Sequence, residues 1–158
     1  MAKISRRQFI VGAAAAGTGA CVCGLGGCAT VTKVGDTPAI SSTAYRVENK
    51  RMQIDLRNAP ELAKVGGSVK IIDGKLSQPI IIARTGEAQY AAVSLLCPHR
   101  SVEVEYQHAD RQFRCASLGH STFGEDGCLR NGFADKPLTR FDAKLDPSDK
   151  TRLIVTLT

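Results

Sequence analysis

The sequence predicts a single all-β domain of antiparallel strands, and three observations support this prediction. Short runs rich in β-branched and aromatic residues recur from Ala44 onward, separated by turn signals such as Asp73-Gly74. No amphipathic helix of useful length and no internal repeat is present. The 158 residues are 43% hydrophobic and 23% charged, which is ordinary for one globular domain. This composition excludes a multi-span membrane protein, a disordered tail and a collagen-like repeat.

The expected strands are short and closely spaced. Residues 51–56 alternate polar and apolar side chains, whereas 79–84 is an apolar run with three consecutive isoleucines. One helical turn at most fits at 61–65, before Gly66-Gly67. In chain order, strands are expected at 51–56, 68–72, 79–84, 90–96, 102–106, 111–114, shortly after Gly127, at 138–145 and at 152–157.

The N-terminal segment has the pattern of an export signal rather than of a folded element. It is basic and contains no acid before Asp36. Ser5-Arg6-Arg7-Gln8-Phe9, followed by a weakly hydrophobic stretch of Ala, Gly and Val, resembles the twin-arginine signal. The alternative is a disordered basic tail. The resemblance predicts that the domain is exported across the cytoplasmic membrane.

A possible lipidation site follows the apolar stretch. Leu25-Gly26-Gly27-Cys28 resembles a bacterial lipobox, in which the cysteine carries the lipid after cleavage. The alternative is an uncleaved anchor helix over 9–31, which six glycines disfavour because each weakens a lone helix by roughly 1 kcal/mol relative to Ala. We therefore expect a signal peptide at 1–27, a flexible tether at 28–43 and the domain at 44–158. The domain would lie on the periplasmic side of the cytoplasmic membrane, with the outer membrane as an alternative.

The charge of the mature chain gives no sign of nucleic-acid binding. Half of the formal net charge of +6 belongs to residues 1–27, which contain Lys3, Arg6 and Arg7 and no acid. The remaining charges are interspersed, and no basic cluster alternates with aromatic residues. Cys21 and Cys23 also lie in the expected signal, and an odd number of thiols remains if Cys28 carries lipid. An exported protein with that count is not simply building a disulfide framework.

Two short Cys and His motifs carry the candidate chemistry. The first is Cys97-Pro98-His99, and the second runs from Cys115 to His120. An expected hairpin separates them, so two cysteines and two histidines can converge on one metal centre. Two centres use such a ligand set: a structural Cys₂His₂ zinc site, and a [2Fe-2S] cluster with two thiolates on one iron and two imidazoles on the other.

Over residues 67–141 the sequence resembles the Rieske iron–sulfur family. The family's first loop is Cys-x-His, which Cys97 and His99 match, and its second loop begins at a distance that Cys115 satisfies. Further matches follow in the family's order at Ser121, Phe123, Asp126-Gly127, Gly132 and Pro137-Leu138. The export signal fits the same resemblance, because exported Rieske subunits often carry a twin-arginine signal.

The resemblance implies a fold of three antiparallel sheets with a small cluster-binding subdomain, whose loops are 95–101 and 114–124. It implies a [2Fe-2S] cluster held by Cys97, His99, Cys115 and His120, with Ser121 as a hydrogen-bond donor. The expected function is one-electron transfer, with a quinol or c-type cytochrome as partner or within a larger oxidoreductase complex. No carboxylate pair or catalytic triad is apparent, so we expect an electron-transfer subunit rather than a stand-alone enzyme.

The second loop departs from the family pattern Cys-x-x-His-Gly-Ser. Leu118 occupies the position of the family's second histidine and cannot bind a metal, and the loop continues Gly119-His120-Ser121. His120 is the nearest substitute, and Gly119 could give the backbone the freedom to place its imidazole. The alternative is a decayed site in a cluster-less or zinc-binding structural lipoprotein. His108, the third histidine, is expected to be a solvated turn residue.

The residues around the motifs predict a low reduction potential. Val102 and Ser117 stand where high-potential members of the family have a disulfide, so no such clamp can form. Phe123 lacks the hydroxyl that a tyrosine would offer to the cluster. With fewer hydrogen-bond donors, the potential should lie in the lower part of the Rieske span of roughly −150 to +300 mV.

Two residues outside the motifs also carry expectations. Cys128 is expected to be a small buried hydrophobic residue, the alternatives being an intermolecular disulfide or an extra ligand. Lys70 is expected to be solvated.

Overall fold

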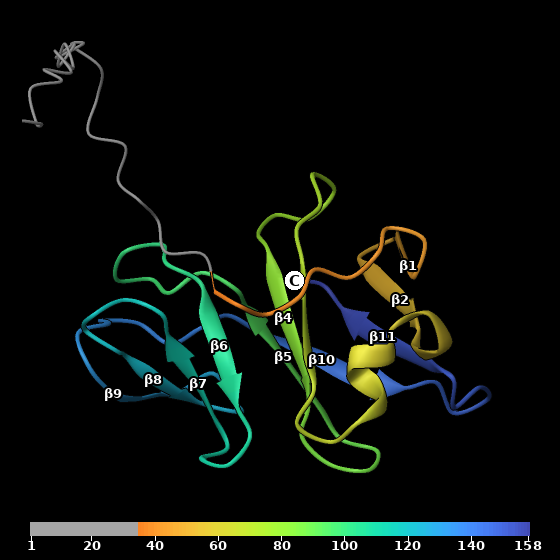
Figure 1. Cartoon of the computed structure of the whole chain (residues 1–158). Helices are drawn as coiled ribbons and strands as arrows, with labels where there is room; N and C mark the ends of the chain where they lie inside the picture. The colour runs from red at the N-terminus through yellow and green to blue at the C-terminus, as the bar shows by residue number, and fades with distance from the viewer. Residues whose placement is uncertain (1–34) are drawn as a thin grey trace, which may run out of the picture. The chain divides into compact units, whose positions relative to one another are not determined.

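The computed structural model describes residues 35–158, which form an almost entirely antiparallel β structure (Figure 1). The expected export signal and lipidation site at Cys28 lie outside these residues. The strands are β1 (Tyr45–Glu48), β2 (Arg51–Asp55), β3 (Ser68–Ile71), β4 (Ile80–Arg84), β5 (Tyr90–Ser94), β6 (Val104–Gln107), β7 (Gln112–Cys115), β8 (Thr122–Gly124), β9 (Leu129–Asn131), β10 (Arg140–Leu145) and β11 (Arg152–Thr156). Two short 3₁₀ helices, η1 (Leu56–Asn58) and η2 (Pro60–Ala63), follow β2. No helix in 35–158 is long and apolar enough to cross a membrane.

The strands form one seven-stranded sheet and one four-stranded sheet. The larger sheet has the order β1-β2-β11-β10-β5-β4-β3, and the smaller has the order β6-β7-β8-β9. Strand β10 changes partner along its length: Arg140 and Phe141 pair with β5, whereas 142–145 pair with β11. The larger sheet therefore consists of two four-stranded halves that share β10. Together with the small sheet they make the three antiparallel layers expected from the sequence, and the all-β prediction is confirmed.

Strands β4 and β5 lie between two hydrophobic cores. Ile81 and Val93 face the core shared with the four-stranded sheet, whereas Ile80, Ile82 and Ala92 face the core formed with β2, β10 and β11. Successive side chains of a strand point to opposite faces, so a strand buried on both faces needs apolar residues at every position. This arrangement explains the run of three isoleucines in β4.

Two strands were not expected from the sequence. Strand β1 has only half-buried or exposed residues and is held at the edge of the sheet by pairing with β2. Strand β8 has three residues and pairs with β7 and, across an irregularity, with β9. Neither shows a periodicity long enough to identify a strand, so their partners decide the conformation. The expected helical turn is present as η2, which begins at Pro60.

The expected tether at 28–43 is attached to the domain in its described part. The backbone N–H of Lys70 donates to the carbonyl of Pro38 (2.8 Å), and the N–H of Ile40 donates to the carbonyl of Lys70 (3.0 Å). Ala39 thereby forms a parallel bridge with Lys70 at the free edge of β3. The expectation that the chain is a free tether as far as Thr43 is therefore wrong for residues 35–40.

The expectation that Lys70 is solvated is also wrong. The residue is only 8% exposed, and its Nζ lies 2.8 Å from Glu103 Oε2 on the strand that follows the first Cys motif. Lys70 alternates with apolar neighbours in β3, and the sequence carries no sign of a partner 33 residues away. Charged residues are rarely buried without such a partner.

Candidate metal centre

The two Cys motifs lie on neighbouring loops because each loop is closed by its own backbone. In the first, between β5 and β6, Cys97 N–H donates to the carbonyl of Val102 (2.8 Å) and Ser101 N–H donates to the carbonyl of Cys97 (2.8 Å). In the second, between β7 and β8, Cys115 N–H donates to the carbonyl of Ser121 (2.8 Å). These bonds turn the chain sharply at each cysteine. Cys115 is therefore the last residue of β7, and Cys97 lies three residues after the end of β5 in a loop held by backbone hydrogen bonds.

Cys97 and Cys115 come together in the interior. Their exposures are 0% and 1%, and both are free thiols. Burial raises the pKa of the Cys97 thiol, and a hydrogen bond with the Cys115 thiol raises it further. The Cys115 thiol also lies 3.2 Å from Ser117 Oγ. The predicted pair of thiol ligands is thus brought together in one buried core.

His99 has a buried ring nitrogen without a partner. Among the described residues, its Nδ1 is the one buried side-chain nitrogen or oxygen that makes no hydrogen bond. Leaving such an atom unsatisfied costs on the order of 1–3 kcal/mol, and buried polar atoms in folded proteins nearly always have a partner. The orphaned nitrogen therefore marks a place where a ligand fits.

His120 is present in the second loop but is not drawn into the same cluster. Its side chain is exposed, and its Nδ1 lies 3.4 Å from the backbone carbonyl oxygen of Cys115. Its φ of 41° is in the left-handed region that non-glycine residues rarely adopt. Within residues 35–158 no three or more His, Cys, Asp or Glu side chains are grouped closely enough to hold a metal ion. The structure thus joins the two cysteines and leaves both imidazoles apart from them.

A third loop, residues 132–137 between β9 and β10, packs against the other two. The predicted residue Ser121 is 1% exposed, and its Oγ accepts hydrogen bonds from the N–H groups of Phe133 (3.1 Å) and Ala134 (3.1 Å). Gly132 has φ +107°, and a Cβ there would meet the Cα of Ser121 at 2.4 Å, so only glycine fits. The Ser121 hydroxyl hydrogen remains available for donation, because both N–H groups occupy its oxygen as acceptor.

Phe133 is the site residue that the sequence analysis missed. Its ring lies 6.1 Å from the His99 ring, with 29° between the planes, and its Cδ2 lies 2.9 Å from where a Cβ on Gly119 would be. Phe133 therefore contacts both cysteine loops. The available signal was an aromatic residue directly after Gly132 in an otherwise polar loop, but nothing in the sequence showed what it would cover.

Three further residues from the sequence analysis are Cys128, His108 and Phe123. Cys128 is exposed, and the expectation that it is a buried hydrophobic residue is wrong. It follows the Asp126-Gly127 turn, where its N–H donates to Asp126 Oδ1 (3.0 Å), so the turn directs the side chain outward. His108 is an exposed turn residue, as expected. Phe123 is fully buried in the core that contains Cys97 and Cys115.

Comparisons with known proteins concern the fold of this chain. No protein-family model matches the chain, and no curated protein matches it in sequence. The cyanobacterial plasma membrane Rieske protein PetC3 from Synechocystis PCC 6803 has a similar structure, with a TM-score of 0.50 and 21% identity, over 61% of this chain and 92% of that chain. The ferredoxin of carbazole 1,9a-dioxygenase from Nocardioides aromaticivorans IC177 has a TM-score of 0.50 and 18% identity, over 60% of this chain and 88% of that chain. At these identities the likeness concerns the fold alone, and the chain has a Rieske-like fold.

Proposed function

We propose that this chain is a one-electron carrier that holds a Rieske-type [2Fe-2S] cluster. The observation that carries the proposal is the buried Nδ1 of His99, which has no hydrogen-bond partner and lies two residues beyond the buried thiol of Cys97. Two thiolates and two imidazoles are the ligand set of such a cluster, which accepts and releases one electron at a time when bound.

The cysteines fit this role chemically. Burial raises the pKa of the Cys97 thiol, which disfavours the thiolate when no cation is bound. A bound metal ion takes thiolates, and binding therefore releases their protons. Cys97 and Cys115 would hold the inner iron, because both side chains point into the core.

His99 and His120 would hold the outer iron. His99 already has a free nitrogen within the protein interior. His120 has to turn away from the carbonyl of Cys115, and the neighbouring Gly119 supplies the backbone freedom for that movement. Leu118 does not occupy the space at the cysteines, because it is 97% exposed.

A redox partner would reach the outer imidazoles at the tip formed by the three loops. Leu118 and Phe133, at 97% and 72% exposure, have the most exposed large apolar side chains in residues 35–158. The Phe133 ring lies against the His99 ring, and Leu118 precedes His120 by two residues. We propose a quinol or a c-type cytochrome as partner, alone or within a larger oxidoreductase complex.

We further propose that the protein is exported by the twin-arginine route and anchored through lipid on Cys28. The support is the Ser5-Arg6-Arg7-Gln8-Phe9 signal and the lipobox that precedes Cys28. Mass spectrometry of the mature N-terminus, together with fractionation of cells expressing a Cys28→Ser variant, tests this part. An unmodified Cys28 in a membrane-free fraction would contradict it.

The decisive experiment on the cluster is EPR of the dithionite-reduced full-length protein, with iron and acid-labile sulfide measured on the same sample. We expect two irons per chain and a Rieske spectrum. Cys97→Ser and His120→Ala should each abolish that spectrum, whereas the matched variant His108→Ala should leave it unchanged, because His108 lies in a hairpin turn away from the loops. A colourless protein that contains zinc would refute the proposal. Persistence of the spectrum in His120→Ala would refute the assignment of that ligand alone.

A further inference from the structure

Residues 35–40, here called the strap, connect the two sheets. In Figure 1 the strap is the orange trace that starts beside β6 and crosses toward β1 and β2. On one side, its backbone pairs with Lys70 at the edge of β3. On the other side, the strap is bound by Glu103 and Glu105, which are two residues apart. Their carboxylates accept hydrogen bonds from the first two N–H groups of the strap. Glu103 Oε2 accepts from Gly35 N–H (2.8 Å), and Glu105 Oε1 accepts from Asp36 N–H (2.6 Å).

A buried ion pair completes this connection. Lys70 Nζ lies 2.8 Å from Glu103 Oε2, and the two side chains are 10% and 12% exposed. Lys70 Nζ also donates to the carbonyl oxygen of Gly35 (3.3 Å). The Gly35 peptide groups thus satisfy both members of the pair, one through its N–H and the other through its carbonyl. Such satisfaction matters, because removing one partner of a buried pair leaves an uncompensated charge.

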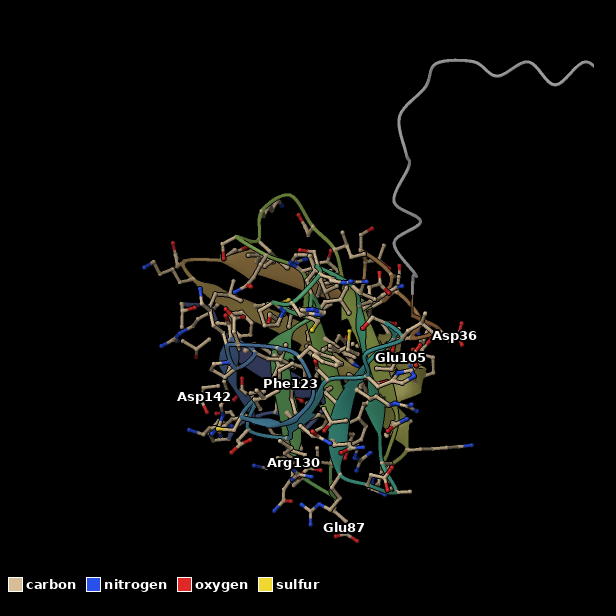
Figure 2. The ribbon with its side chains drawn as sticks, turned by 90° about the vertical axis from the view of Figure 1, so that its left-hand side faces the viewer. Asp36, Glu87, Glu105, Phe123, Arg130 and Asp142 are labelled. Atoms are coloured by element: carbon tan, nitrogen blue, oxygen red, sulfur yellow. The ribbon has the colours of Figure 1, made fainter. Side chains whose placement is uncertain are left out.

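The strap also excludes a side chain where it meets the glutamates. A Cβ on Gly35 would lie 3.0 Å from Glu105 Oε1 and 3.3 Å from Glu103 Oε2. These separations are tighter than ordinary van der Waals contact. In Figure 2 Asp36 and Glu105 lie together at the edge of the domain, as their hydrogen bond requires.

Glu103 contacts both cysteine loops through its backbone. Glu103 forms an isolated antiparallel β-bridge with Leu96, the residue before Cys97. Its carbonyl oxygen accepts a hydrogen bond from the N–H of Ala116, the residue after Cys115 (3.0 Å). One residue therefore touches the neighbour of each candidate thiol ligand. The same residue carries the side chain that the strap and Lys70 hold in place.

We propose that Glu103 is a positioning residue that sets the relative placement of the two cysteine loops, and that Lys70 and the strap fix it. Its side chain is anchored to β3 and the strap, and its backbone transmits that anchoring to Leu96 and Ala116. The part of this inference that concerns a cluster rests on the proposed function, whereas the part that concerns the loops does not.

The first test needs no cluster and uses amide hydrogen exchange in the full-length, metal-free protein. We expect Glu103→Gln to accelerate exchange at Gly35 and at Ala116 by about tenfold, because the loss of charge leaves Lys70 unpaired and loosens both anchors. The matched control is Glu105→Gln, which removes the same charge from the same segment. It should accelerate exchange at Asp36 and leave Ala116 unchanged, because the backbone of Glu105 pairs with Arg114 and not with the loops.

Two results would overturn the proposal. In the first, Glu103→Gln accelerates exchange at Gly35 but leaves exchange at Ala116 unchanged. The strap would then be attached to the domain without affecting the placement of the cysteine loops. The other is an equal effect of Glu105→Gln on Ala116. If Glu103→Gln does not fold, Gly35→Ala serves in its place, because it pushes on the carboxylates without removing a charge.

The second test uses the iron-loaded protein. Glu103→Gln should shift the EPR g values and the reduction potential although no ligand is changed, and Glu105→Gln should alter neither. Unchanged g values and potential in Glu103→Gln would show that the loops keep their placement without the pair, and would overturn the positioning role. Absence of any Rieske spectrum in the wild type would refute the proposed function and leave the exchange experiment as the measure of the loop contact.

Discussion

At the scale of single residues, the cysteines and histidines of the candidate centre differ in how far the sequence could place them. Cys115 ends a strand whose buried and half-buried side chains alternate, so its burial follows from that alternation, whereas Cys97 lies in the loop after β5. The orphaned Nδ1 of His99 was not foreseeable, because its surroundings include Phe133, which lies 34 positions further along the chain. Local sequence identifies a ligand type, and distant residues decide what surrounds it.

Few side-chain hydroxyl groups lie near the thiols, and this predicts a low reduction potential. Phe123 has no hydroxyl, and Ser117 Oγ is the side-chain oxygen that lies within 3.2 Å of Cys115. Donors stabilise the reduced cluster, because they compensate its additional negative charge. We expect a potential in the lower part of roughly −150 to +300 mV.

Ser117→Ala should lower that potential further, by about 60 mV, which corresponds to about 1.4 kcal/mol in a one-electron couple. When Cys115 is a thiolate, the Ser117 hydroxyl becomes the donor and its loss disfavours reduction. An EPR-monitored redox titration measures the change, and the exposed Ser148→Ala is the control. A wild-type potential near the upper end of the range, or a Ser117→Ala protein that titrates like wild type, would contradict this prediction.

At the scale of elements, the β6–β7 hairpin carries both loops at one end and an ionic network at the other. Glu125, in the turn after β8, accepts from the Tyr106 hydroxyl (2.7 Å) and from Arg111 Nη2 (2.8 Å). Burial acts to raise the pKa of Glu125, but the hydrogen bonds from Arg111 and Tyr106 outweigh it and hold the pKa below its ordinary value. The network joins the hairpin to the strand beside it.

This network makes the stability of the domain depend on acid pH. Because the folded pKa of Glu125 is lowered, its contribution is complete above the unfolded value of about 4.3 and is lost as the pH falls through the folded pKa. Glu125→Gln should therefore lower stability by about 1 kcal/mol at pH 7 and by less at pH 3. Thermal unfolding of both proteins at the two pH values tests this. Equal differences at pH 7 and pH 3 would show that the ionised carboxylate contributes nothing.

The elements that the sequence did not predict share one property. Strands β1 and β8 have only four and three residues, and each takes its conformation from the strands with which it pairs. The strands that were predicted, such as β4 and β11, bury apolar residues in a regular pattern. Strand pairing uses backbone N–H and C=O groups, which nearly every residue has. Such pairing does not require a particular type of side chain, so the sequence does not reveal it.

At the scale of the whole molecule, β4 and β5 separate the core beneath the cysteine loops from the core of the larger sheet. Ile81 belongs to the first and Ile82 to the second, and both are fully buried. The two residues are chemically identical neighbours on one strand. They therefore form a matched pair for asking which core supports the loops.

Ile81→Ala and Ile82→Ala should each lower the free energy of unfolding by about 2–5 kcal/mol, because each leaves a cavity in a packed core. Only Ile81→Ala should accelerate the release of iron under native conditions, because its core contains Cys97 and Cys115. Denaturant unfolding and the decay of visible absorbance in the presence of a chelator measure the two effects. Faster iron release in Ile82→Ala than in Ile81→Ala would contradict this assignment.

The amino-acid sequence was sufficient for properties that depend on neighbouring residues. Alternation of side chains and turn dipeptides are local, and they predicted the all-β class and most strands. Folding decided the rest. Lys70 is paired with Glu103, and the Phe133 ring lies against the His99 ring. Each of these contacts joins positions more than 30 residues apart in the sequence. The energy of a buried charge or a shielded ring depends on which atoms surround it in space, and neighbours along the chain do not reveal those atoms.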